Sequence, residues 1–131
     1  MDFRIESDSI GSRNVPKEAY YGVQSLRAKE NFKITGLMLN EEFIKGLAET
    51  KKAAALVNGS IGLLDEKIEK ALVKACDEII DGKLHDQFIV DPIQGGAGTS
   101  ANMNINEVIS NRAIEILGGE KGDYKIVHPN D

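Results

Sequence analysis

The sequence predicts a mainly α-helical domain with short extended segments near its start. Three stretches repeat apolar residues at the spacing of a helix that buries one face. Each stretch ends at a glycine, and two of them begin at a residue type that commonly caps a helix. No internal repeat, low-complexity tract or linker divides the chain, so we expect residues 1–131 to fold as a single domain.

The start of the chain is predicted to be extended rather than helical. Residues 3–22 alternate polar and apolar side chains in places and are broken by glycine, asparagine and proline, which is typical of short strands joined by turns. A short helix is expected over residues 23–31. Residues 33–39 are expected to be extended or irregular around Gly36.

The first two long helices are predicted from their caps and their apolar faces. Asn40 and Asp65 stand at their starts, where a side-chain oxygen can accept from the first free backbone amides. Asn58 and Gly59 end the first helix, and Gly82 ends the second. The residues expected on their apolar faces are Phe43, Ile44, Leu47, Ala48, Ala54, Ala55 and Leu56 in the first, and Ile68, Leu72, Ala75, Cys76, Ile79 and Ile80 in the second.

A third long helix is predicted to begin near Ser100 and to end at Gly118 and Gly119. Residues 84–100 precede it and cannot be regular helix past Pro92, so they are expected to form a loop that leads into the helix N-terminus. The apolar residues expected to be buried on this helix are Ile105, Val108, Ile109, Ala113, Ile116 and Leu117.

Composition and charge exclude several classes of function. Sixteen basic and 21 acidic residues give a net charge of −5, and no basic block is interleaved with aromatics, so a nucleic-acid surface is not expected. No apolar stretch is long enough to cross a bilayer, and no basic and apolar leader opens the chain. We therefore expect a cytoplasmic protein with no membrane partner. The single cysteine, Cys76, is expected to be a core residue rather than a nucleophile.

Small and polar residues from Gln94 to Ser100 form the candidate binding site. They read Gln-Gly-Gly-Ala-Gly-Thr-Ser, so backbone amides can approach a ligand closely, and they run straight into a helix. A helix N-terminus offers unpaired N–H groups and about half a positive charge, which suits an anion. Thr99 can add a hydroxyl donor, and Asn102 and Asn106 follow on the same side of the helix.

Two other interpretations compete with an anion site. Glycine-rich turns before helices are common, and a serine or threonine there is often only an N-cap, an alternative that the residues alone leave open. A nucleotide site is disfavoured, because no lysine follows the last glycine and no strand-and-crossover unit surrounds the loop.

Long segments of the chain resemble the aspartases of the aspartase/fumarase superfamily. The string DQFIVDPIQGGAGTSANMNINEVISNRA, from Asp86 to Ala113, is similar to their first signature region, and AYYGVQSLRAKENF, from Ala19 to Phe32, is similar to their N-terminal block. RIESDSIG and VHPND fall in the expected places. Class II fumarases are the closest alternative, but they usually read W-Q-T-G-S-G-T-Q-S-N-M-N here, whereas this chain has no tryptophan. The aspartases, which are aspartate ammonia-lyases, are therefore preferred.

The resemblance implies a place for this chain in a larger enzyme. A mostly helical N-terminal lyase domain would be followed by a long helical bundle and a small C-terminal domain, and residues 1–131 would stop before the bundle. Four subunits would assemble into a homotetramer with composite active sites that bind L-aspartate and fumarate. No cofactor and no metal ligands are expected. Without the bundle, the chain is expected to be able to self-associate through the face left exposed.

The resemblance also assigns expected roles to residues of the loop. Thr99 corresponds to the threonine that hydrogen-bonds a substrate carboxylate, and Gly98 offers the adjacent backbone. Ser100, Asn102 and Asn104 are expected to support the loop, and substrate contact by the two asparagines stays open.

A second group of candidates lies at the end of the chain. His128, Asn130 and Asp131 match a stretch that forms a second carboxylate site in fumarase relatives, and a purely structural turn is the alternative. His85 is expected to be structural or exposed.

No catalytic residue is assigned within these residues. In the family a serine on a mobile glycine-serine-serine loop takes the substrate proton, and that loop has no counterpart here. We therefore expect an excised portion of an enzyme that is inactive alone. A natural stand-alone binding or assembly module is the alternative from another class.

Overall fold

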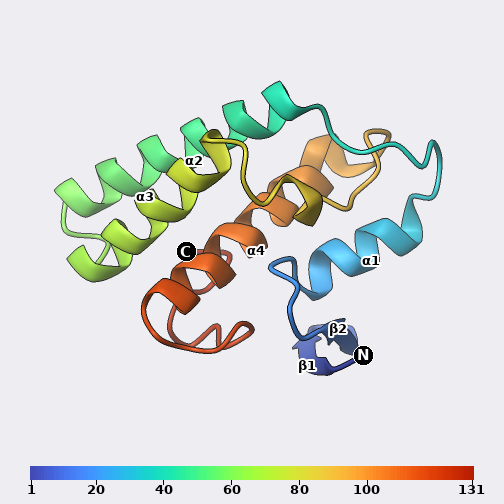
Figure 1. Cartoon of the computed structure of the whole chain (residues 1–131), viewed down its shortest axis with the longest axis horizontal. Helices are drawn as coiled ribbons and strands as arrows, with labels where there is room; N and C mark the ends of the chain where they lie inside the picture. The colour runs from blue at the N-terminus through green and yellow to red at the C-terminus, as the bar shows by residue number, and fades with distance from the viewer.

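A β-hairpin and four α-helices follow one another in the computed structural model, which describes residues 1–131 (Figure 1). More than one residue in two is helical, as the sequence predicts. The elements are β1 (Phe3–Asp8), β2 (Gly11–Pro16), α1 (Val23–Asn31), α2 (Glu41–Ser60), α3 (Glu66–Ile80), the 3-10 turns η1 (His85–Gln87) and η2 (Gly96–Gly98), and α4 (Thr99–Ile116). None of these helices is both long and apolar enough to span a bilayer.

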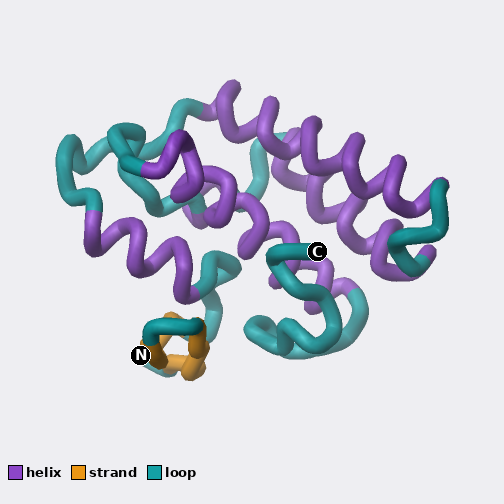
Figure 2. Tube along the Cα trace, turned by 180° about the vertical axis from the view of Figure 1, so that it is seen from behind, coloured by secondary structure: helices purple, strands orange, loops and turns teal.

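The hairpin confirms the extended start that the sequence predicts. β1 and β2 pair antiparallel from Phe3 opposite Pro16 to Asp8 opposite Gly11. Arg4 fixes this hairpin to the segment that enters α1, because its guanidinium donates to four backbone carbonyls and to the carboxylate of Glu6, at 2.7 to 3.1 Å. The hairpin therefore lies against the start of α1, at one edge of the molecule (Figure 2).

The helices α2 and α3 form an antiparallel pair whose starts confirm both predicted caps. The side chain of Asn40 accepts from the amides of Glu42 and Phe43, and that of Asp65 accepts from the amides of Lys67 and Ile68. The two helices approach closely at Gly59, where an added Cβ would lie 1.9 Å from a carboxylate oxygen of Glu69 and would displace the end of that side chain. The pair lies along one side of the molecule (Figure 1).

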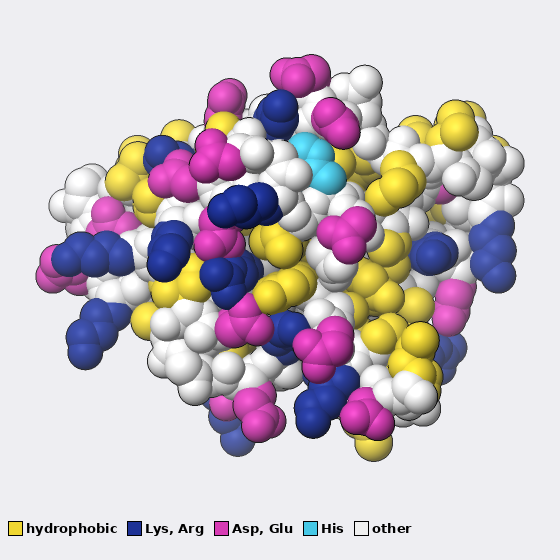
Figure 3. Space-filling view, viewed as in Figure 1, with side chains coloured by type: hydrophobic (Ala, Val, Ile, Leu, Met, Phe, Trp, Pro, Cys, Tyr) yellow, Lys and Arg dark blue, Asp and Glu magenta, His cyan; other side chains and the backbone are white.

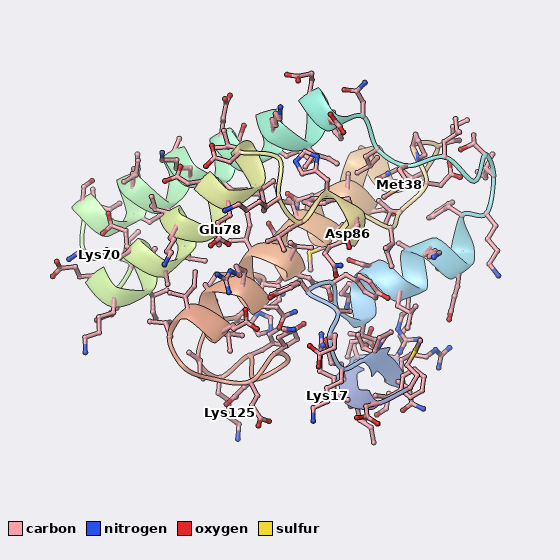
Figure 4. The ribbon with its side chains drawn as sticks, viewed as in Figure 1. Lys17, Met38, Lys70, Glu78, Asp86 and Lys125 are labelled. Carbon is pink, nitrogen blue, oxygen red and sulfur yellow. The ribbon has the colours of Figure 1, made fainter.

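α4 runs through the centre, between the α2–α3 pair and α1 (Figure 1). An ion pair ties it to α3, because Arg112 donates to both carboxylate oxygens of Glu78, at 2.6 and 2.9 Å, and the Arg112 guanidinium lowers the pKa of Glu78. Glu78 is labelled on α3 in Figure 4. Cys76 is buried, as predicted, and burial raises the pKa of its thiol to about 12. The main core consists of Leu39, Ile44, Ala48, Ala75, Cys76, Ile79, Phe88, Val90, Ala101, Ile105, Val108 and Ile109.

Part of the predicted burial is wrong. On α2, Phe43 and Leu56 are 50% and 45% exposed and Ala54 is exposed, because α3 and α4 cover only one side of this helix. Ile116 and Leu117 near the end of α4 are only half-buried. More apolar side chains are exposed on the segment that connects α1 to α2, residues 32–40, which we call the strap and which includes Met38 (Figures 3 and 4).

The sequence pattern also does not reveal how deeply three polar side chains of α4 are buried. Asn104, Glu107 and Asn111 are at most 1% exposed. Glu107 accepts from the amides of Gln24 and Ser25, at 3.0 and 2.7 Å, and from the Ser25 hydroxyl. Because these groups belong to the first turn of α1, Glu107 caps that helix from α4.

Candidate functional site

The glycine-rich loop makes a tight left-handed turn just before α4. Gly96, Ala97 and Gly98 have φ values of +71°, +53° and +88°. Glycine adopts this region freely, but an alanine there costs about 1–2 kcal/mol. Such strain is kept only where the surrounding structure imposes it, and it is common at binding sites.

Thr99 is the first residue of α4 and lies at the mouth of this turn. Its side chain is exposed, and its hydroxyl donates to the carbonyl of Gly96. Gly98 precedes it as the N-cap and contributes no side chain, and a Cβ built on Gly98 would meet nothing within 4 Å. Open space therefore lies in front of the loop backbone, whereas Ser100 is buried behind it.

The electrostatics at the start of α4 differ from those of the other helices. α2 and α3 each have two acidic residues in the first turn. The first amides of α1 donate to carboxylates, that of Val23 to Glu6 and those of Gln24 and Ser25 to Glu107. α4 has no acidic residue in its first turn, so no negative side chain there offsets the positive end of its dipole.

Asp91 anchors the loop to the strap between α1 and α2. Its buried carboxylate accepts from the amides of Thr35, Gly36 and Ile93 and from the Thr35 hydroxyl, at 2.7 to 3.0 Å. Burial acts to raise the pKa of Asp91, but the hydrogen bonds from Ile93, Thr35 and Gly36 outweigh it and lower the pKa to about 2. The charged form thus holds the loop in place.

Replacing Asp91 with asparagine is expected to lower the melting temperature at neutral pH, and this effect should disappear in acid. The pKa of about 2 lies below the ordinary 3.8, so the stabilisation is complete above about pH 4 and is lost as the pH falls toward 2. Thermal unfolding of the wild type and Asp91→Asn across this range measures the difference. Asp86→Asn, on the exposed Asp86 of the same connection (Figure 4), is the matched control. A difference that stays constant with pH would contradict the assignment.

The asparagines behind the loop occupy two environments. Asn104 is fully buried, donates to the carbonyl of Gln87 at 3.0 Å and accepts from the amide of Val90 at 3.4 Å. Asn102 is exposed and accepts from the Lys51 ammonium of α2 at 2.7 Å. Asn104 therefore supports the connection before the loop, whereas Asn102 faces α2.

The end of the chain folds back onto a cavity of about 210 Å³ between α2, α3 and α4. His128, Asn130 and Asp131 line it together with Lys51 and Asn106. The ring nitrogen Nδ1 of His128 accepts from the amide of Asn130 at 3.0 Å, so the chain turns back on itself at these residues. Thr99 and Gly98 do not line this cavity, so the loop and the chain end are separate sites along α4.

His85 was named in the sequence analysis, whereas Lys51 was not. His85 is half-buried, and its Nε2 lies 2.9 Å from the carbonyl oxygen of Ile79, a structural contact. Lys51 was missed because its place beside Asn102 depends on how α2 crosses α4, and burial lowers the pKa of its ammonium. No three His, Cys, Asp or Glu side chains are grouped so that they could hold a metal ion.

Comparison with known proteins identifies the family to which this helical fold and the loop before α4 belong. The family model described as Lyase matches residues 11–131, and the chain belongs to this family, within the aspartase/fumarase superfamily. The chain is 60% identical to the aspartate ammonia-lyase of a Bacillus species over 129 residues, which are 98% of this chain and 28% of that relative.

A fumarate hydratase and a solved structure are also similar to this chain. The class II fumarate hydratase of Halobacterium salinarum is 52% identical over 99% of this chain and 27% of its own length. A crystal structure titled fumarate lyase:delta crystallin from Brucella melitensis superimposes with a TM-score of 0.97 at 53% identity, over 99% of this chain and 31% of that one. The chain thus spans less than a third of the length of each of these relatives.

Proposed function

We propose that residues 1–131 are the N-terminal domain of an aspartate ammonia-lyase, which reversibly deaminates L-aspartate to fumarate and ammonia. One observation supports this most strongly: an uncharged glycine-rich loop leads into a helix start without acidic residues, in a chain 60% identical to such an enzyme. The role of the loop is to bind a carboxylate of aspartate or fumarate through Thr99 and the backbone at Gly98.

The chemistry of deamination suits this loop. Removal of the proton beside the side-chain carboxylate produces a dianion, and its accumulated negative charge is the main barrier. Preorganised donors at the developing charge are the most effective catalytic device for such a step. The Thr99 hydroxyl can turn from the Gly96 carbonyl to a substrate oxygen, and the strained turn holds the backbone fixed beside it.

The proposed site is incomplete within this chain. No candidate general base stands at the loop, because residues 95–99 bear no ionisable side chain. We place the base, a serine on a mobile loop, and the remaining substrate contacts in segments of the enzyme outside these residues. His128, Asn130 and Asp131 are proposed as a second carboxylate site at the cavity, with Ser100, Asn102 and Asn104 as support for the first.

Assembly into a homotetramer is part of the same proposal. Apolar side chains near the junction of α2 and α3 are exposed, namely Leu56, Val57, Ile61 and Leu63, at 45% to 76%. Contiguous exposed apolar residues mark surfaces that other protein covers. These residues are available for the rest of the enzyme or, in its absence, for self-association.

A class II fumarase is the second candidate, favoured by the 52% identity to the Halobacterium salinarum enzyme. Its substrate is also a dicarboxylate, so the same loop geometry would serve it. The loop sequence Gln-Gly-Gly-Ala-Gly-Thr-Ser, without a tryptophan, supports the ammonia-lyase.

Fumarate formation by the full-length enzyme tests the proposal. Ultraviolet absorbance follows fumarate with L-aspartate and L-malate as parallel substrates. Fumarate from aspartate alone is the expected result, because the loop is of the aspartase type. Fumarate from malate alone would assign the chain to a fumarase.

The 131-residue chain serves as the control for completeness. It is expected to form no fumarate from either substrate, since it contains no base at the loop. Steady deamination by the purified chain would contradict this. A reading frame that continues through a serine-rich motif and a glycine-serine-serine loop would exclude a stand-alone module.

A further inference from the structure

Gln94 connects the two ends of the glycine turn. Its side-chain oxygen accepts from the amide of Ala101 at 2.8 Å, and its side-chain nitrogen donates to the carbonyl of Asp91 at 3.0 Å. Ala101 is the third residue of α4, so Gln94 caps this helix from outside it. One half-buried side chain thus spans the turn that leads to Thr99.

The turn needs such a brace because its backbone is strained. Three consecutive residues, 96–98, have positive φ, and one of them is alanine. The N-cap Gly98 has no side chain with which to hold the helix start. The Gln94 amide and the short contact from Thr99 to Gly96 are the side-chain hydrogen bonds that bridge this turn.

The brace is also neutral. A glutamate at this position could accept from Ala101 equally well, and carboxylates cap α1 in this way through Glu6 and Glu107. At α4, however, a carboxylate would place a negative charge beside the donors that face the ligand. An amide caps the helix without opposing an anion.

We propose that Gln94 is a positioning residue for the carboxylate-binding loop, bracing the turn before Thr99 while keeping the start of α4 free of negative charge. This inference rests on the proposed function, because it requires an anionic substrate at the loop. It adds a residue whose side chain acts through the loop backbone rather than by touching substrate.

Two substitutions in the full-length enzyme separate bracing from charge. Gln94→Met removes both hydrogen bonds without adding charge, so the donors are less well ordered and kcat is expected to fall about tenfold with a smaller change in KM. Gln94→Glu keeps the acceptor for Ala101, loses the donor to the Asp91 carbonyl that Gln94→Met also loses, and adds a charge. It is expected to raise KM for the dicarboxylate and to lower kcat/KM about 100-fold.

Melting temperature and a matched control distinguish this role from simple stabilisation. A glutamate near a helix start favours the helix, so Gln94→Glu is expected to melt within a few degrees of the wild type. Gln24→Glu adds the same charge to the first turn of α1, on an exposed side chain away from the loop. It replaces an amide that donates to Asp8 at 3.2 Å, so a slightly lower melting temperature with wild-type kinetics is expected.

Each combination of kinetic and melting results either supports or overturns the positioning role of Gln94. A Gln94→Glu enzyme with kcat/KM within twofold of the wild type overturns the proposal, as do losses in both variants that merely follow a lower melting temperature. Inactivity of the wild type on both aspartate and malate would refute the proposed function instead. A normal melting temperature with a high KM in Gln94→Glu, and a low kcat in Gln94→Met, supports the role.

Discussion

Replacing Thr99 with alanine is expected to lower kcat/KM for fumarate formation from L-aspartate by about 10²- to 10³-fold in the full-length enzyme, the effect of removing one donor to a developing anion. The hydroxyl is exposed at the start of α4 and bonds only within its own turn, so its removal should scarcely change stability. Steady-state kinetics and thermal melting of the purified variant measure both quantities.

Two matched variants sharpen this test. Thr99→Ser keeps the hydroxyl and is expected to recover most of the activity. Thr50→Ala removes another exposed threonine, whose hydroxyl likewise bonds a carbonyl of its own turn, that of Gly46 at 2.9 Å, and it is expected to keep full activity. If Thr99→Ala retained wild-type kinetics, the loop would have to bind its ligand through backbone alone, and the assignment of the threonine would be wrong.

Truncation of Glu107 to alanine is expected to destabilise the chain by about 3 kcal/mol or more, since each buried donor left without an acceptor costs about 1–3 kcal/mol. Three donors would lose their partner, namely the amides of Gln24 and Ser25 and the Ser25 hydroxyl. Burial raises the pKa of Glu107, and the hydrogen bonds from Ser25 and Gln24 offset this only in part. Urea unfolding of the wild type and the variant measures the change in free energy.

The exposed Glu49 of α2 supplies the control for this experiment. Glu49→Ala exchanges the same side chain at a solvated helix position and is expected to change stability by less than about 0.5 kcal/mol. Equal effects of the two substitutions would mean that Glu107 does not cap α1 in solution.

The sequence predicts what depends on local chemistry. Asn40 and Asp65 cap their helices because an acceptor side chain before a helix acts on amides two and three residues away. The loop before α4 is equally local, because its glycines and the start of the helix lie side by side in the chain. These features need no knowledge of how the helices pack.

The remaining features depend on packing between distant segments. A glutamate in a helix normally indicates a solvated position, yet Glu107 is buried because the start of α1 needs an acceptor there. Phe43 belongs to an apolar stripe whose neighbours cover only part of it. The contact between Lys51 and Asn102 joins residues 51 apart, and no local pattern encodes it.

The contacts that reach the hairpin and the start of α1 from far along the chain, such as those of Glu107, affect the order in which the protein can fold. Tyr124 donates to Glu6 at 2.7 Å across 118 residues, and Asn111 in turn donates to the Tyr124 hydroxyl. Contacts of such long sequence separation form late, because a large loop must close first. During synthesis on the ribosome, the hairpin can pair and be fixed to the start of α1 by Arg4 as soon as these residues emerge. The contacts that Glu107 makes with α1 and Tyr124 makes with Glu6 must wait until nearly all of these residues have been translated.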